Sequence, residues 1–165
     1  MKTKELVRFA IFLAAAVIAS YVEHLIPIPL LFPGAKLGLA NSLSLIILFC
    51  FSKKEYVVFG LLRVLLSALF SGFGTSFFIS LGGNILSSII VVSLTYSKKI
   101  SVYGLSINGA IFHGLGQVLV VSIIYQTFAM INYMAILTIS GIITGVIVAF
   151  IAKMILEKLP KSYFK

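Results

Sequence analysis

Long apolar segments recur along the whole chain, separated by short polar stretches or by stretches rich in glycine and proline. A bilayer-spanning helix needs about 20 predominantly apolar residues, and the apolar segments here approach that length. The chain of 165 residues is 61% hydrophobic and only 10% charged, which is too little charge to cover a soluble domain. The sequence therefore predicts an all-α integral membrane protein with a single transmembrane domain over residues 1–165.

Hydropathy and helix-breaking residues together predict a bundle of six transmembrane helices. Their expected ranges are 7–26, 37–52, 55–71, 75–96, 102–125 and 133–157. The first range follows basic residues, as a signal peptide does, but it is longer and has no small-residue cleavage pattern before Glu23. We therefore interpret it as a retained helix.

The distribution of basic residues predicts how the bundle is oriented in the cell membrane. Of the 13 Lys and Arg residues, all except Lys36 and Arg63 lie before or at the start of the first span, after the second, after the fourth or near the C-terminus. The positive-inside rule then places both termini in the cytoplasm and the connections 27–36, 71–75 and 126–132 outside. The same rule explains the net charge of +9, so we expect no nucleic-acid partner.

Arg63 lies in the middle of the third predicted span. An ionisable group at this depth is costly and normally faces a partner or a water-filled cavity. At 1.5 Å of rise per residue, Arg63, Asn84 and Gln117 all lie about 12–14 Å below the outer ends of their spans. His113 lies one turn below Gln117 on the same helix face. Three helices thus present polar groups at one level of the membrane.

Three more polar residues, Glu23, Lys36 and Asn41, are expected nearer the outer rim. Glu23 is the one acid expected in the membrane region and it faces two cations, Lys36 and Arg63, so one cation has no acidic partner. Because an uncompensated buried cation is strongly unfavourable, we predict a ligand with at least one acidic group. The alternative is that these groups satisfy one another, with Glu23 paired to Lys36 or Arg63 and the amides bonded between helices.

The outward connection 27–35 reads PIPLLFPGA, and its prolines and glycine prevent it from continuing a helix. We interpret it as an apolar lid over an outward-facing cavity, with Lys36 at the cavity mouth. A plain turn that dips into the membrane interface is the alternative.

Small residues recur at a spacing of four, which lets helices approach closely. These small residues could serve packing inside the bundle or docking on a partner protein, and the sequence does not choose between the two. They are Ala10 and Ala14, Ala15 and Ala19, and, in the sixth span, Gly141 and Gly145.

Four motifs in order along the chain resemble those of one family. They are PGAKLGLAN at 33–41, LLRVLL at 61–66, GGN at 82–84 and GAIFHGLGQ at 109–117. Together they resemble the Gx transporter family, also labelled heptaprenyl diphosphate synthase component I. That family is similar to the S components of energy-coupling factor (ECF) transporters, which are small six-helix membrane proteins.

The resemblance implies a substrate-binding role. An S component captures a scarce metabolite on the outer side and docks on a module of one membrane scaffold subunit and two ATPases. An alanine pair in the first helix commonly meets the scaffold, which here would be Ala10 and Ala14 or Ala15 and Ala19. The chain has no phosphate-binding loop, so any ATP hydrolysis is expected from its partners.

The second family label suggests prenyl diphosphate synthesis, but the residue types argue against catalysis by this chain. Such chemistry needs divalent metals held by clustered carboxylates. The chain has no aspartate, and its four glutamates are scattered. We expect no catalytic residue, no metal and no cofactor. A non-catalytic accessory subunit of a prenyl diphosphate synthase is the alternative function, and a ligand-free structural subunit is a third.

The expected function is therefore the capture of a small anionic or amphipathic metabolite, such as a quinone or isoprenoid precursor. Arg63 is the expected anion anchor. The full set of expected substrate-binding residues is Glu23, Lys36, Asn41, Arg63, Asn84, His113 and Gln117.

Overall fold

The computed structural model describes residues 2–25, 38–97, 99–160 and 163–164, which form an all-helical protein. The predicted lid 27–35 and Lys36 lie outside the described residues. The elements, in chain order, are α1 (Thr3–Leu25), α2 (Leu39–Cys50), α3 (Lys53–Ser71), α4 (Thr75–Leu94), α5 (Val102–Tyr125), the short 3-10 helix η1 (Ala129–Tyr133) and α6 (Met134–Lys158).

The helix boundaries follow the predicted spans to within a few residues, and the differences have local causes. Helix α3 begins two residues earlier than predicted, because Ser52 and Glu55 form a capping box ahead of the apolar segment. The Glu55 N–H donates to Ser52 Oγ at 3.3 Å, and the Ser52 N–H donates to Glu55 Oε2 at 2.6 Å. Lys53 and Lys54 are thereby helical although they are polar, which is why hydropathy placed the start too late.

Four helices, α1, α4, α5 and α6, are long and apolar enough to cross a membrane. Helix α2 has 12 residues and is therefore about 18 Å long, which is shorter than the roughly 30 Å hydrocarbon core of a bilayer. Helix α3 carries Lys53, Lys54, Glu55 and Arg63. The protein is thus a membrane-type helical bundle, and spanning by α2 and α3 stays a prediction.

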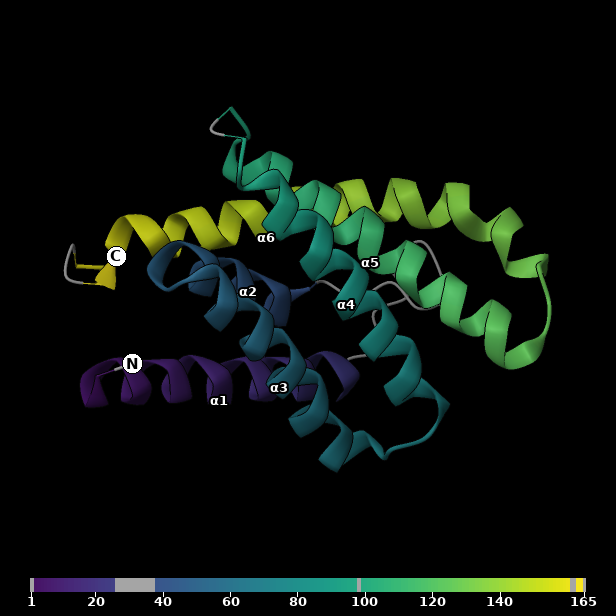
Figure 1. Ribbon diagram of the computed structural model, residues 1–165, viewed down its shortest axis with the longest axis horizontal. Coiled ribbons are helices and arrows are strands. Elements are labelled where there is room, and N and C mark those ends of the chain that lie inside the picture. Colours follow the sequence, from purple (N-terminus) through teal and green to yellow (C-terminus); the bar gives the residue numbers. More distant parts are fainter. Residues whose placement is uncertain (1, 26–37, 98, 161–162, 165) are drawn as a thin grey trace.

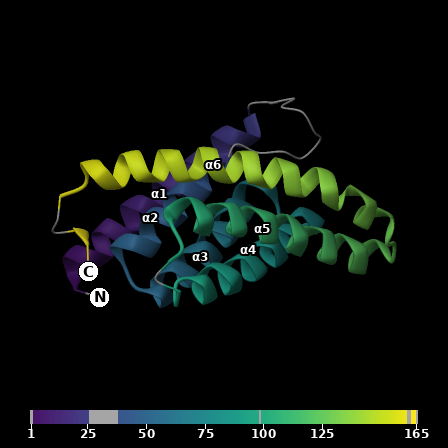
Figure 2. The same ribbon diagram turned by 90° about the horizontal axis from the view of Figure 1, so that it is seen from above.

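The helices form two connected groups (Figures 1 and 2). Helix α5 packs along both α4 and α6, whereas α1, α2 and α3 pack on one another. The groups join where α2 contacts α6 and where α3 contacts α4. Both termini and the connection between α2 and α3 lie toward one end of the molecule, and the connections after α3 and α5 lie toward the other (Figure 1).

The hydrophobic core lies largely between α1, α2 and α3. The Phe9 ring meets Phe59 and Phe51 edge-on, with ring centroids 5.4 and 5.9 Å apart. Ile46 and Ile47 on α2 are fully buried, because α1, α3 and α6 surround this short helix. Large apolar side chains such as Ile11, Leu69 and Ile123 are instead exposed on the outer surface, as suits contact with lipid.

Glycines bring α5 close to both of its neighbours. A β-carbon added to Gly116 would lie 2.5 Å from the Gly82 oxygen on α4. One added to Gly145 on α6 would lie 2.7 Å from the Ile107 Cα on α5, and one added to Gly141 would lie 3.3 Å from the Ile111 nitrogen. The Gly141 and Gly145 stripe therefore serves packing inside the bundle.

Candidate functional site

Arg63 lies at the centre of a polar cluster between α1, α2 and α3. Its side chain is buried, with 7% of the residue exposed. Arg63 Nη1 donates a hydrogen bond to Asn41 Oδ1 at 2.6 Å. Arg63 Nε is buried and has no hydrogen-bond partner among the described residues. The guanidinium is thus held by a neutral amide, and part of its donor capacity is unused.

The Glu23 carboxylate accepts a hydrogen bond from the N-terminus of α2. The Leu39 N–H donates to Glu23 Oε1 at 2.6 Å, which pairs one of the backbone donors that a helix leaves free at its N-terminus. A carboxylate at this position also interacts favourably with the helix dipole. Gly38 precedes the helix with φ of 77°, a left-handed conformation that favours glycine.

Glu23 and Arg63 form no ion pair within 4.0 Å, and both belong to the described part of the chain. Of the two pairings that we considered for Glu23, the one with Arg63 is therefore absent from this structure. The one with Lys36 falls outside the described residues.

Asn84 on α4 packs against α3. It is 6% exposed and packs against Gly60, because a β-carbon added there would lie 2.7 Å from Asn84 Nδ2. Gly60 precedes Arg63 by three residues, so both lie within one turn of α3. Asn84 Oδ1 is buried and has no hydrogen-bond partner among the described residues.

His113 and Gln117 face α4 next to Asn84. A β-carbon on Gly83 would lie 2.9 Å from Gln117 Cγ and 3.0 Å from His113 Cε1. The structure therefore arranges the described candidates in two groups, one where α3 meets α1 and α2 and one where α4 meets α3 and α5. The first group is Glu23, Asn41 and Arg63, and the second is Asn84, His113 and Gln117.

A small pocket of about 190 Å³ lies between α1 and α3, displaced from Arg63 toward the C-terminal end of α3. It is lined by Val17, Ser20, Tyr21, Ser67, Phe70 and Ser71. Ser67 follows Arg63 by four residues and so lies on the same helix face. Its Oγ is buried without a partner in the described structure. Ser67 was not predicted from the sequence, although its spacing of four residues from Arg63 was a usable signal.

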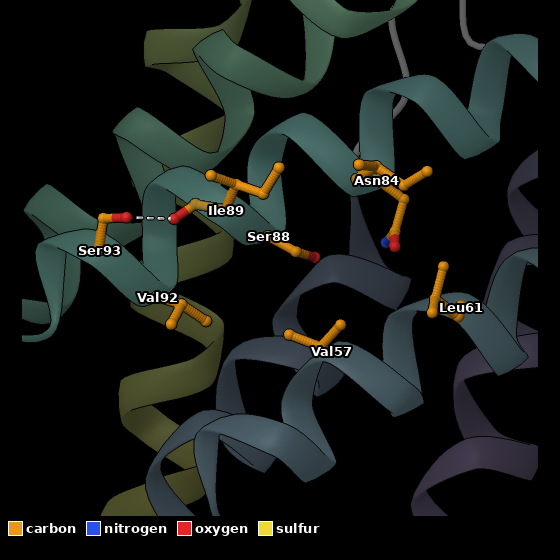
Figure 3. Close-up of a pocket in the computed structure, with 8 residues that line it drawn as sticks. Val57, Leu61, Asn84, Ser88, Ile89, Val92 and Ser93 are labelled. Atoms are coloured by element: carbon orange, nitrogen blue, oxygen red, sulfur yellow. Dashed lines mark hydrogen bonds between the residues drawn. The ribbon is translucent and has the colours of Figure 1, made fainter.

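A larger groove of about 480 Å³ lies between α3 and α4 (Figure 3). Asn84 lines it, but none of the other described candidates does. The remaining lining residues are Val57, Leu61, Ile85, Ser88, Ile89, Val92 and Ser93.

The alanines of α1 lie mostly on its outer face. Ala10, Ala14 and Ala15 are exposed and Ala19 is half-buried. Ala16 is fully buried and faces α2 and α3. Both predicted alanine pairs are thus at least partly accessible to a partner helix.

Within the described residues, no group of three or more His, Cys, Asp or Glu side chains could hold a metal ion.

The fold and the buried cluster define a helical membrane protein with a cation and several amides between its helices. Residues 12–155 match the family model described as heptaprenyl diphosphate synthase component I, and the chain belongs to that family. The match confirms this part of the resemblance, and it covers every candidate residue except Ala10. No match was found among curated proteins or among solved structures.

Proposed function

We propose that this chain is the substrate-binding subunit, or S component, of an ECF-type uptake transporter, and that it captures a small anionic or amphipathic metabolite from outside. The observation that carries the proposal is the environment of Arg63. This buried cation has a neutral amide as its hydrogen-bond partner and has no carboxylate within 4.0 Å among the described residues. A bound acidic group would compensate the charge.

Unused donors support an anion at this place. Arg63 Nε and Ser67 Oγ are both buried without partners in the described structure, and they project from neighbouring turns of α3. A carboxylate or phosphate accepts several hydrogen bonds at once, and arginine presents a planar fork that fits it. The pocket at Ser67 provides an approach from the end of the bundle that we assign to the outside.

The rim of this pocket favours an amphipathic ligand. Tyr21 on α1 and Phe70 on α3 line it, with their ring centroids 5.7 Å apart. Aromatic rings here would cover an apolar portion while Arg63 and Ser67 bind the acidic end. A quinone precursor acid and an isoprenoid phosphate both combine these two parts. The predicted binding residues Asn84, His113 and Gln117 lie where α4 meets α3 and α5, apart from this anion site, and are not assigned to its ligand.

In this proposal the protein crosses the cell membrane six times with both termini in the cytoplasm. The proposal gives the chain no catalytic role, because ATP hydrolysis would belong to two partner ATPases bound through a membrane scaffold subunit. The exposed alanines of α1 would form the contact with that scaffold. The accumulation of Lys and Arg near the termini supports the orientation.

Native mass spectrometry tests the proposal. Wild type, Arg63→Met and the control Arg8→Met are incubated with a small-metabolite extract and then purified in detergent. Arg8 is the other arginine of the chain, and its guanidinium lies 3.9 Å from the Tyr163 ring centroid near the termini. We expect an acidic ligand on wild type and Arg8→Met but not on Arg63→Met. Retention of the ligand by Arg63→Met, or no ligand on wild type, would contradict the proposal.

A second candidate function is a non-catalytic accessory subunit of a prenyl diphosphate synthase, which the family description favours. Mild-detergent purification from the native membrane separates the two. Co-purification of a membrane scaffold with ATPases supports the transporter, whereas a stable complex with a soluble synthase supports the accessory subunit.

A further inference from the structure

The groove between α3 and α4 has the size of a small-molecule site. Its volume of about 480 Å³ falls within the roughly 300–1,000 Å³ of typical ligand pockets. Its walls are mainly aliphatic, with Val57 and Leu61 on α3 facing Ile85, Ile89 and Val92 on α4. None of the described residues that line it is charged. These walls suit an uncharged, mainly apolar molecule.

The groove has a polar floor with one unmet hydrogen bond. Figure 3 shows the Asn84 amide pointing from α4 toward α3, between Ser88 and Leu61. Asn84 is more than nine-tenths buried, and its Oδ1 has no partner in the described part of the chain. Ser88 beside it is also buried, with 4% of the residue exposed. The floor therefore offers an acceptor to any donor that enters the groove.

The groove is separate from the anion site proposed above. Val57 and Leu61 lie about 120° and 160° around α3 from Arg63, at 100° per residue, so they face away from the guanidinium. The groove opens sideways instead, because Leu61, Ile85 and Ile89 on its rim are 38%, 44% and 55% exposed. This flank is apolar and would face the hydrocarbon of the membrane.

We propose that this groove binds a neutral lipophilic molecule with a hydroxyl group, such as a long-chain alcohol or a phenol, which enters from the bilayer. Its hydroxyl donates to Asn84 Oδ1, and its hydrocarbon lies along Val57, Ile89 and Val92. Asn84 is about 13 Å from the N-terminal end of α4 and about 15 Å from the C-terminal end. A charged lipid head group, which stays at the membrane surface, would not reach it.

The test uses dodecanol with a photoreactive diazirine on its chain, compared with its methyl ether, which cannot donate a hydrogen bond. The full-length protein is placed in nanodiscs of zwitterionic lipid, irradiated with each probe, and mapped for labelled residues by mass spectrometry. Asn84→Leu removes the acceptor, and Ile89→Trp fills the groove. Ile139→Trp, at a residue on α6 that is 55% exposed as Ile89 is, is the matched control.

We expect the alcohol to label the groove of wild type about two- to tenfold more than the ether does, as one hydrogen bond allows. Asn84→Leu should remove this preference. Ile89→Trp should reduce labelling by both probes, and Ile139→Trp should not. Equal labelling of wild type by alcohol and ether, or uniform labelling of all exposed apolar faces, would overturn the proposal. So would a native dimer in which a second copy shields the groove from both probes.

Discussion

Arg63 on α3 donates a hydrogen bond to Asn41 on α2, with 2.6 Å between Nη1 and Oδ1. This bond joins the middle of α3 to the first turn of a helix that contacts α1, α3 and α6. The partner is an amide, so the bond positions the guanidinium without neutralising it. In the proposed function this leaves the charge of Arg63 to an acidic ligand, while the protein already determines the geometry of the guanidinium.

The two residues should be energetically coupled. Asn41→Leu leaves a buried cation without its acceptor, and we expect a loss of about 1–3 kcal/mol in unfolding free energy. In the double variant Asn41→Leu with Arg63→Met, neither polar group is left, so most of this loss should be recovered. A double-mutant cycle, measured by denaturant unfolding in detergent, checks this. Additive effects of the two changes would show that the bond is not formed in the membrane protein.

Glu23 should stabilise α2 mainly through its hydrogen bond to the Leu39 N–H. Glu23→Gln keeps an acceptor and loses the charge at the helix N-terminus, which costs about 0.3–1 kcal/mol. Glu23→Ala also loses the charge-assisted bond, for a total of about 2–4 kcal/mol. The control is Glu157→Gln, whose side chain is 65% exposed and 3.9 Å from Lys153. Equal unfolding free energies of Glu23→Ala and Glu23→Gln in detergent would show that the hydrogen bond to Leu39 does not contribute to stability.

Two glycines of α5, only two residues apart, should respond differently to alanine. Gly116→Ala places a β-carbon 2.5 Å from the Gly82 oxygen and 2.9 Å from the Gly83 Cα, so α4 and α5 must separate, at a cost of about 1–3 kcal/mol. Gly114→Ala meets only Leu137 Cβ at 3.7 Å and should be neutral or stabilising by up to about 1 kcal/mol, because alanine favours helix. Thermal unfolding of both variants in the same detergent makes the comparison. Equal melting temperatures would contradict the close packing of α4 on α5.

If α1 docks a membrane scaffold subunit, enlarging its exposed alanines should weaken that contact. Ala14→Trp adds a bulky side chain where the proposed partner helix approaches, and Ala14 is already exposed, so folding should be unaffected. We expect at least a tenfold reduction in co-purified scaffold, equivalent to about 1.4 kcal/mol. Ile142→Trp, at a 42% exposed position on α6, is the control. Undiminished co-purification with Ala14→Trp would place the docking surface elsewhere.

Several features of the protein were already determined by its sequence. A chain this apolar must satisfy its backbone hydrogen bonds within each segment in a lipid environment, and helices do so locally. Helix positions therefore follow from hydropathy and helix-breaking residues, as the agreement between the predicted span 75–96 and α4 shows. Counting residues along the helices also predicted similar depths for Arg63 and Asn84. In the structure Asn84 packs against Gly60, which lies within one turn of Arg63 on α3.

Partner choice within the polar cluster was decided only by the tertiary structure. Glu23 bonds to the Leu39 backbone and Arg63 bonds to Asn41, whereas sequence analysis allowed Glu23 to pair with Arg63. The separate groove at Asn84 was likewise not foreseen. The physical reason is that helices such as α5 and α6 carry apolar residues on every side, so no single hydrophobic face specifies their rotation. Rotation and crossing angle come from the fit of glycines and large side chains between helices, and these determine which polar groups meet.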